Sequence, residues 1–378
     1  MGYGTVAIRH NNGSYETVSK ISGSEPYVSL MQELIQPANF TPDGKRIPDG
    51  MSWQDWILWR AKRRMNKTLG RPAAPQVAGL SIMVSQLLEA AQAKLGEKVK
   101  AAVLSQPDAL TLTDEEVDDI FDHLGIKNLM SDKRDPLFSQ LFATSVAYAG
   151  YGKGLCGNYT DVYGCETEEY FFPSKWTLFL DYSQESLSGG FGHVQDARMF
   201  RVQLKFVEPS LGCRHLSDYT DEDMYWTKVT SRIREFVMST RREVQELVLT
   251  GESVSDQRFH TALRNALAEF SSGRGSVVFL GREMLEMLEE IEQLDFLFAT
   301  AKGAAEFAKR RLEDIHKLRV LDISPSGSLV ISSLVLQKYL KDLSEASAEK
   351  ADALMHSGLF RRGTGRPEDK ATSLTFKY

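Results

Sequence analysis

The stretch Trp176–Gly192, WTLFLDYSQESLSGGFG, decides how we interpret this chain. Its apolar run, Leu178–Leu180, predicts a buried strand that ends at a single carboxylate, Asp181. The polar residues that follow predict a turn, with Gly189, Gly190 and Gly192 behind it. Because a buried strand that delivers a carboxylate to a turn is a common way to build a site, we expect the functional site here.

The bulk composition indicates a globular protein. The chain has 378 residues, 42% hydrophobic and 25% charged, enough for a large core in two lobes. The net charge of -6 disfavours a nucleic-acid partner. No apolar run reaches the roughly 18 residues of a membrane span, so no membrane partner is expected. Three cysteines without a CxxC pair predict reduced thiols in a cytoplasmic protein.

Strands and helices alternate along the chain, which predicts an α/β architecture. An alternating segment, 3–31, predicts a hairpin around an Asn11–Gly13 turn, and Gly150–Pro173 is expected to be a loop. Further strands are expected at Lys100–Leu104, Lys175–Leu180, Arg198–Val207, Glu246–Thr250 and Ser276–Leu280. Helices are expected at Met51–Asn66, Leu80–Leu95, Thr111–Leu124, Leu137–Ala149, Asp221–Arg241, Asp256–Phe270, Met284–Leu294 and Phe298–Leu312.

Two groups of potential metal ligands favour structural interpretations. Thr111–Leu124 begins with an N-cap at Thr113 and carboxylates in the first turn. Neighbouring carboxylates on a helix point apart, so a solvated helix start is favoured over a cation site. Cys156 and Cys165 are nine residues apart with no histidine between them, so no metal is expected there.

Six segments occur in an order that resembles a known family. They are KAAVLSQP, EEVDDIFDHLGI, LFATSVAYAGYGKG, LFLDYSQES, ELVLTGESVSDQRFHTALRNAL and LFATAKGAAEFAKRR. The set is similar to the nucleotide-binding domain of the heat-shock 70 kDa chaperones, and more narrowly to divergent chaperone-like proteins of filamentous fungi. The resemblance covers Met51–Arg311, with a weaker match over Thr5–Gly23.

The resemblance implies an actin-like ATPase fold, related to ribonuclease H, with two lobes around a central cleft. Residues 1–175 would form lobe I, with an insert subdomain over approximately 24–98. Residues 176–311 would form lobe II, in which 213–245 is the remnant of a reduced adenine lid. Residues 312–378 would form a helical C-terminal extension with a flexible tail. The first strand of the fold would be truncated.

The phosphate hairpins depart from the family pattern. Gly4 and Thr5 correspond to the first turn, but no strand with an aspartate precedes them. In the second hairpin Asp181 is kept, Ser186 replaces a threonine, and all three family glycines are lost. Glu185 places a negative charge where a triphosphate would lie, a repulsion on the order of a kcal/mol or more. We therefore expect no ATP-Mg cofactor and no metal.

The adenosine turn and the catalytic lysine depart similarly. The turn keeps Gly251, but Glu252 replaces a second glycine. The chaperones' catalytic lysine could correspond to Lys62 or Lys67.

These changes favour a repurposed cleft that binds a small organic molecule. Asp181, Glu185 and Glu252 would converge there as candidate acid/base groups, with Tyr182 and His193 as weaker candidates. The chemistry would be cofactor-free cyclisation, isomerisation or dehydration in fungal specialised metabolism. The alternative is a non-catalytic pseudo-ATPase scaffold that binds a protein partner. An active ATP-dependent chaperone is the least favoured of the three.

Overall fold

The computed structural model describes residues 2–35, 39–40, 46–47, 53–110, 112–131, 141–198, 200–270, 280–281 and 295–321. By contacts, the chain divides into two units, Met1–Lys317 and Leu318–Tyr378. The predicted helix Met284–Leu294, most of the predicted strand Ser276–Leu280 and the tail beyond 321 lie outside the described residues.

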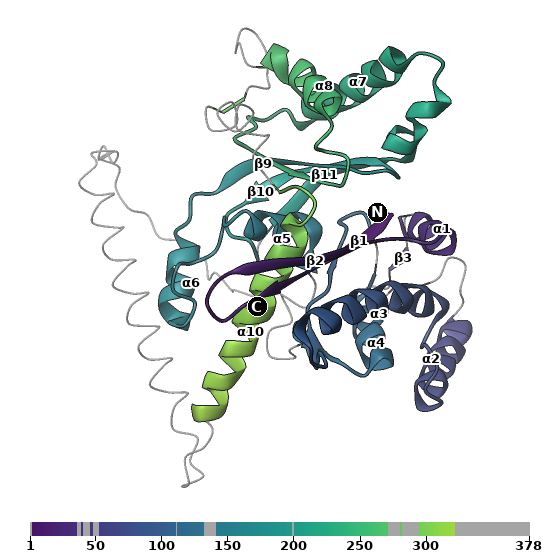
Figure 1. Cartoon of the computed structure of the whole chain (residues 1–378), viewed down its shortest axis with the longest axis vertical. Helices are drawn as coiled ribbons and strands as arrows, with labels where there is room; N and C mark the ends of the chain where they lie inside the picture. Colours follow the sequence, from purple (N-terminus) through teal and green to yellow (C-terminus); the bar gives the residue numbers. More distant parts are fainter. Residues whose placement is uncertain are drawn as a thin grey trace, which may run out of the picture. The chain divides into compact units, whose positions relative to one another are not determined.

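A four-stranded sheet in the order β11-β10-β9-β12 lies at the centre of the first unit (Figure 1). The central strand β9 (Lys175–Tyr182) pairs antiparallel with β10 (Leu187–Val194) and parallel with β12 (Glu246–Thr250). The fourth strand is β11 (Phe200–Glu208). The strands predicted at the positions of β9, β11 and β12 are thus confirmed.

The predicted turn lies in the polar residues between Tyr182 and Leu187, and the glycines behind it belong to strand β10. The pairing of β10 with β11 shifts register between Phe191 and Gly192. A Cβ on Gly189 would lie 2.5 Å from a ring carbon of Phe206 on the neighbouring strand. The glycine makes room for an aromatic ring, which the local sequence does not reveal.

Side chains of β9 point alternately to two helical layers. Leu178, Leu180 and Tyr182 pack in one core with α7 (Glu222–Thr240) and α8 (Gln257–Leu267). Phe179 packs in a second core with α5 (Ala143–Gly150) and α10 (Ala299–Leu321). Figure 1 shows the two helix pairs on opposite sides of the sheet. Asp181 shares the face of Phe179 by this alternation.

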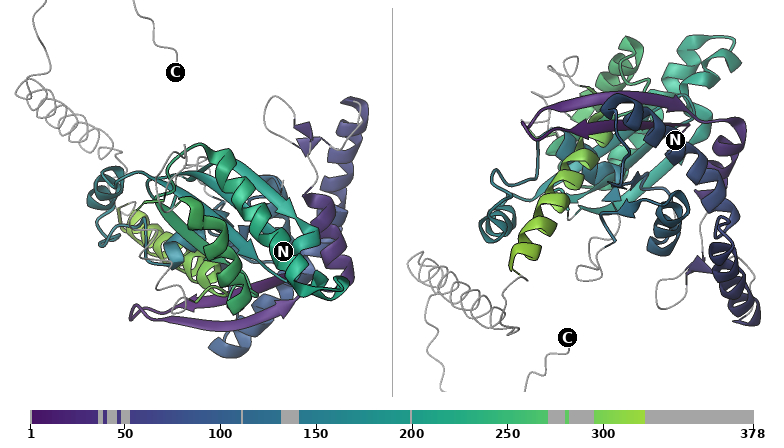
Figure 2. Two further views of the ribbon diagram at one scale, coloured as in Figure 1. Left: turned by 90° about the horizontal axis from the view of Figure 1, so that it is seen from above. Right: turned by 60° about the horizontal axis from the view of Figure 1, so that its bottom comes forward.

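A hairpin and a third apolar core complete the first unit. Strands β1 (Tyr3–Arg9) and β2 (Tyr15–Ser22) form the predicted hairpin, which crosses α10 (Figure 2). The third core is formed by α1 (Glu25–Leu34), α3 (Pro75–Leu95) and α4 (Asp114–Leu124). The remaining elements are α2 (Trp53–Thr68), α6 (Val162–Tyr170), and the short strands β3 (Asn39–Phe40), β4 (Arg46–Ile47), β5 (Ala101–Ala102), β6 (Ser105–Gln106), β7 (Lys127–Asn128) and β8 (Leu141–Phe142).

Three local expectations are corrected by these elements. Helix α1 begins inside the alternating segment 3–31, and its Pro26 sits in the first helical turn, where proline is tolerated. Helix α6 likewise forms inside the expected loop Gly150–Pro173. The strand expected at Lys100–Leu104 is reduced to the two-residue strand β5, and β6 follows beyond it.

The start of α4 is confirmed, but its carboxylates are not all solvated. Thr113 and Glu116 form a reciprocal capping box. Asp119 is buried and forms ion pairs with Arg63 Nε at 2.5 Å and with Lys67 Nζ at 2.7 Å. Cations from α2 therefore compensate the buried charge, as burial of a carboxylate requires.

Helices α5 and α10 touch through two glycines. A Cβ on Gly150 would overlap the carbonyl oxygen of Ala299, and a Cβ on Gly303 would overlap that of Val146. The two backbones are therefore in direct contact, which holds α10 against the sheet.

We expect Gly303→Ala to lower the free energy of unfolding by about 2–3 kcal/mol, because the new methyl group would force the two helices apart. The sign is informative, since glycine to alanine in an unobstructed helix stabilises by about 1 kcal/mol. Urea denaturation gives the measurement. Gly157→Ala is the control, because no atom lies within 4 Å of its added Cβ. An equal or higher stability for Gly303→Ala would contradict the close contact.

Candidate functional site

The parallel pairing of β9 with β12 brings two strand ends together. Thr250 lies opposite Asp181 in this register, and its Oγ1 donates a hydrogen bond of 2.9 Å to Asp181 Oδ2. Gly251 follows with a φ of +123°, a conformation that favours glycine. A Cβ there would overlap the carbonyl oxygen of Tyr182. Asp181 and the turn after β12 are therefore held side by side.

The carboxyl group of Asp181 lies in an unfavourable environment for its charge. Burial raises the pKa of Asp181. The charge of the α-amino group and the hydrogen bond from Thr250 lower it, and the nearby charge of Glu252 raises it. Tyr3 of β1 belongs to the same group. Burial raises the pKa of Tyr3 well above its usual value, and the charges of Asp181 and Glu252 raise it further. The structure thus brings together Tyr3, Asp181 and Glu252.

Glu252 has a cationic partner. Its side chain is 8% exposed and forms an ion pair with Lys20 of β2. The backbone N–H of Gln184 donates a second contact to Glu252 Oε1 at 3.2 Å. The Lys20 ammonium also lies 5.4 Å from the ring centre of Tyr3. Glu252 therefore links its own turn, after β12, to the β1–β2 hairpin and to the turn after β9.

Glu185 is paired in the same way, on the other side of the turn. Its carboxylate lies 2.5 Å from Arg214 Nη1, and its side chain is 15% exposed. A Cβ on Gly2 would overlap the side chain of Glu185. A backbone hydrogen bond joins the same two segments, since Arg214 N–H donates to the carbonyl of Gln184 at 3.1 Å. Glu185 closes a turn against the segment that follows β11.

The two weaker candidates are not brought to this group. Tyr182 faces the α7–α8 core, where its ring stacks on Phe259 and its hydroxyl lies 3.0 Å from that of Tyr225. His193 lies opposite Trp176, at the other end of β9 from the turn. Five residues of strand separate that end from Asp181, about 17 Å. The expectation that both lie near the carboxylates is wrong.

The positions that resembled nucleotide loops have structural roles here. Gly4 and Thr5 are paired strand residues of β1, not a turn. The carbonyl of Ser186 accepts from Ser183 N–H at 3.0 Å and closes the turn after β9. Gly251 permits the close approach to Tyr182 described above.

The candidate lysines lie on α2. Lys67 Nζ contacts Asp119 and Asp122 of α4, each at 2.7 Å, and Lys62 is exposed. No contact joins either of these lysines to Asp181 among the described residues.

A cavity of about 840 Å³ lies beside Asp181. It is bounded by β1, α3, the segment 99–110, the sheet face that carries Asp181, and α10. Its walls are mostly aliphatic, and the small side chains of Ala304, Ala305 and Ala308 leave space along α10. Glu185 and Glu252 are not part of its wall, whereas Asp181 and Thr250 are.

A second carboxyl group, Asp108, lines the same cavity and was missed from sequence. Burial raises the pKa of Asp108 to about 6, although hydrogen bonds from Thr144 lower it. Thr144 Oγ1 donates to Asp108 Oδ1 at 2.7 Å, and Thr144 N–H donates to Oδ2 at 3.2 Å. The residue follows Pro107 at the end of an apolar run, the same strand-then-carboxylate pattern that singled out Asp181.

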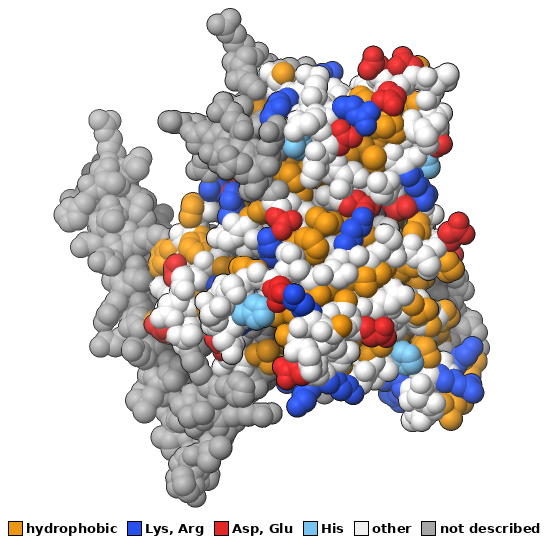
Figure 3. Space-filling model, in the orientation of Figure 1, with side chains coloured by type: hydrophobic (Ala, Val, Ile, Leu, Met, Phe, Trp, Pro, Cys, Tyr) orange, Lys and Arg blue, Asp and Glu red, His pale blue; other side chains and the backbone are white. Residues whose placement is uncertain are grey.

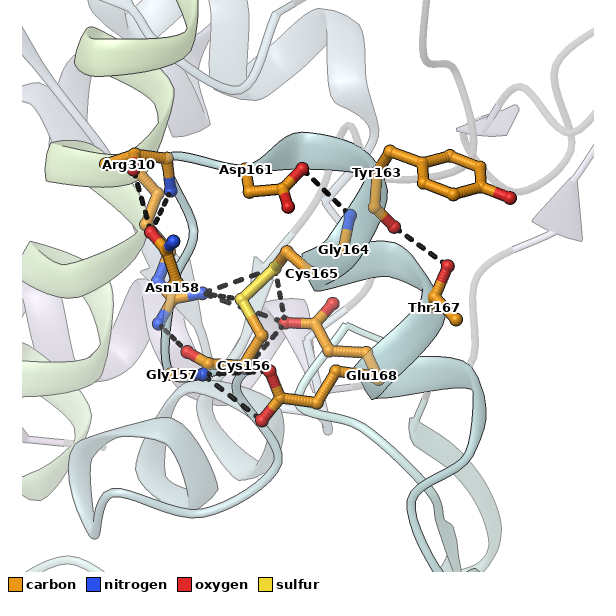
Figure 4. Close-up of a disulfide and its surroundings, with 12 residues drawn as sticks. Cys156, Gly157, Asn158, Asp161, Tyr163, Gly164, Cys165, Thr167, Glu168 and Arg310 are labelled. Carbon is orange, nitrogen blue, oxygen red and sulfur yellow. Dashed lines mark hydrogen bonds and ion pairs between the residues drawn. A yellow bond between two sulfur atoms is a disulfide. The ribbon is translucent and has the colours of Figure 1, made fainter. Parts of the chain in front are cut away.

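Cys156 and Cys165 form a disulfide, so the prediction of three reduced thiols is corrected (Figure 4). Only Cys213 is a free thiol among the described residues. The two sulfurs and a carboxylate oxygen of Glu169 lie within 4.8 Å of one another, a spacing that could hold a metal ion. Guanidinium groups of Arg310 and Arg198 contact the sulfurs at 3.1 and 3.9 Å and would repel a cation.

The surface and the helices add two findings. Acidic and basic side chains are interspersed on the face drawn in Figure 3. Across the described residues, no helix is both long and apolar enough to cross a membrane.

We expect Lys20→Met to cost about 1–3 kcal/mol of unfolding free energy, because it leaves the Glu252 carboxylate buried without its cation. Adding Glu252→Gln should restore most of the loss in a double-mutant cycle followed by urea denaturation. The control is Lys94→Met, which breaks an exposed pair with Glu16 of the same strand and should cost less than 1 kcal/mol. Additive losses at Lys20 and Glu252 would show that the pair is not coupled.

The pH dependence of stability should report Asp108. Because its pKa is higher in the folded state, folding binds a proton, and this contribution to stability is lost as pH rises toward about 6. Between pH 4 and pH 7 we expect Asp108→Asn to gain about 3 kcal/mol relative to the wild type. Thr144→Val should steepen the wild-type dependence, because the hydroxyl stabilises the carboxylate. Parallel pH profiles for the wild type and Asp108→Asn would refute the raised pKa.

No protein-family model matches this chain, and no curated protein matches its sequence.

Proposed function

We propose that this chain binds a mainly apolar small organic molecule in the cavity beside Asp181, and that Asp181 is its acid/base group. The observation that carries the proposal is the 840 Å³ cavity, whose mainly apolar wall includes the carboxyl group of Asp181. Ligand sites in proteins commonly enclose about 300–1,000 Å³ and combine apolar walls with a few polar groups. We also propose that the protein acts in fungal specialised metabolism and is located in the cytoplasm.

Asp181 is better suited to this role than either glutamate. Glu185 and Glu252 each form an ion pair with a basic side chain, and neither lines the cavity. A carboxyl group whose pKa is raised by burial can hold a proton at a pH where an exposed aspartate is ionised, and can donate it to a ligand atom. Such a group supports cofactor-free cyclisation, isomerisation or dehydration. Asp108 is a second such carboxyl on the same wall.

The actin-like ATPase fold is part of the proposal. It is supported by the parallel β9–β12 pair, by the helices on both faces of the sheet, and by the meeting of three turns. The backbone N–H of Ser253 donates to the carbonyl of Tyr182 at 3.1 Å, and that of Cys213 donates to the carbonyl of Ser183 at 2.9 Å. Two of these turns carry glutamates where the chaperones carry glycines, which disfavours an ATP-dependent activity.

A protein-binding scaffold is the second candidate, and one observation favours it. Strand β1 pairs only with β2 among the described strands, and all of Tyr3–Arg9 line the cavity. Consecutive residues of a strand point in opposite directions, so the edge of β1 faces this space. An extended segment of a partner could add to that edge by strand pairing.

Filling the cavity should abolish ligand binding. We expect the neutral apolar fluorophore N-phenyl-1-naphthylamine to bind the wild type with a saturable increase in fluorescence. Ala304→Phe should weaken that binding at least tenfold, because the ring would occupy the cavity. Ala93→Phe, on an exposed position of α3 outside the cavity, is the matched control. Equal binding by both variants would overturn the assignment of this cavity as the site.

We expect the protein not to bind ATP-Mg. Calorimetric titration with ATP-Mg is expected to give no heat of binding with the wild type, since the turn after β9 lacks the glycines that let backbone N–H groups approach a phosphate closely. Micromolar ATP-Mg binding would contradict the proposal and favour a retained nucleotide site.

A further inference from the structure

The disulfide between Cys156 and Cys165 lies in a buried polar network outside the cavity (Figure 4). It joins the loop before α6 to that helix, and both cysteines are buried, with 2% and 4% exposure. Arg310, which reaches the network from α10, is buried with them. A disulfide that only braces a loop does not need buried ionic partners.

The two sulfurs have different neighbours. Arg310 Nη1 lies 3.1 Å from Cys156 Sγ, and Arg310 Nη2 donates to the carbonyl of Cys156 at 3.0 Å. Cys165 Sγ lies 3.6 Å from Glu169 Oε1, 3.9 Å from Arg198 Nη2 and 4.0 Å from Arg310 Nη1. The Arg310 guanidinium is therefore closer to Cys156 than to Cys165, and Glu169 is placed to accept a hydrogen bond from the thiol of Cys165.

The carboxylate and the guanidinium are themselves fixed. Glu169 Oε2 lies 2.7 Å from Arg198 Nη2, and Glu169 Oε1 accepts from the backbone N–H of Cys156 at 3.1 Å. Burial raises the pKa of Glu169, which Arg198 and Arg310 lower and the charge of Asp196 raises. On the other side, Glu306 accepts from Arg310 Nε at 2.9 Å.

We propose that Cys156 and Cys165 form a reversible thiol–disulfide exchange site, whose reduced form holds Cys156 as a thiolate against Arg310 and Cys165 as a thiol that donates to Glu169. An adjacent guanidinium stabilises a thiolate, and a stabilised thiolate is the better leaving group. The co-reactant is a small thiol such as glutathione. Since the sulfurs are buried, exchange requires opening of the exposed loop at Gly157–Asn158.

The exchange is balanced in two steps. A thiolate of the reductant attacks Cys165 Sγ, the bond between the two cysteine sulfurs breaks, and Cys156 leaves as a thiolate beside Arg310. A second reductant thiolate then attacks the reductant sulfur of the mixed disulfide and releases Cys165. Two reductant thiols become one disulfide, and the protein disulfide gains two electrons. One of the two protons ends on Cys165, and the other goes to solvent.

The network extends to the hairpin. Glu306, which holds Arg310, also accepts contacts from Arg9 Nε at 2.6 Å and from the Tyr15 hydroxyl at 2.9 Å. Arg9 belongs to β1, which bounds the cavity. The exchange site is thus separate from the cavity but tied to one of its walls.

The test is equilibration of the full chain in glutathione buffers of stepped ratio, followed by alkylation and mass spectrometry of each cysteine. We expect the wild type to interconvert fully, and Arg310→Gln to shift the equilibrium constant at least tenfold toward the disulfide. Arg311→Gln, the next residue of α10, is the matched control and should behave as the wild type. An unchanged constant in Arg310→Gln would overturn the proposal, as would a disulfide that never forms.

Alkylation rates of the reduced protein with iodoacetamide provide the second readout. Cys156 should react at lower pH than Cys165, with Cys213 as the internal reference thiol. If Arg310→Gln does not fold, as judged by circular dichroism, Glu169→Gln replaces it and should reduce the difference between Cys156 and Cys165. Identical pH profiles for Cys156 and Cys165 in the wild type would refute the asymmetry.

Discussion

The parallel pairing of β9 with β12 is the constraint on which the site depends. It sets Thr250 opposite Asp181, and it requires the following residue to pass against the backbone of Tyr182. Only a residue without a Cβ can do so at the φ of Gly251. Once this register is fixed, alternation along β9 sends Tyr182 into the α7–α8 core and Asp181 toward the cavity. The position of the carboxyl group is thus a consequence of strand geometry.

The charges around this pairing are divided between two tasks. Glu252 and Glu185 join separate parts of the chain, the first to the hairpin through Lys20 and the second to the segment after β11 through Arg214. Asp181 accepts a hydrogen bond from the Thr250 hydroxyl and lines a mainly apolar cavity, and the charge of the α-amino group acts on it as well. Each glutamate is paired with a basic side chain, whereas burial raises the pKa of Asp181. This difference separates the two structural glutamates from the group we assign to the ligand.

Sequence patterns predicted the parts of this structure that depend on local rules. The hairpin, the capping box at Thr113, and the strands β9, β11 and β12 follow from alternation, turn residues and helix caps. Strand β10 was not predicted, because its Gly189 makes room for the ring of Phe206 on another strand. The basic partners of the glutamates and the disulfide were not predicted either. Each of these contacts joins residues that only the fold brings together. Asp108 is the exception, because its strand-end pattern was visible in the sequence.

A crystal structure of the wild type under xenon pressure would show whether an open apolar cavity lies beside Asp181. Xenon enters apolar cavities that are large enough to hold it and leaves well-packed cores empty. We expect xenon between β1, α10 and the face of β9 that carries Asp181, and no xenon at the same place in Ala304→Phe. A wild-type crystal in which side chains fill this space, with no xenon bound there, would contradict this expectation.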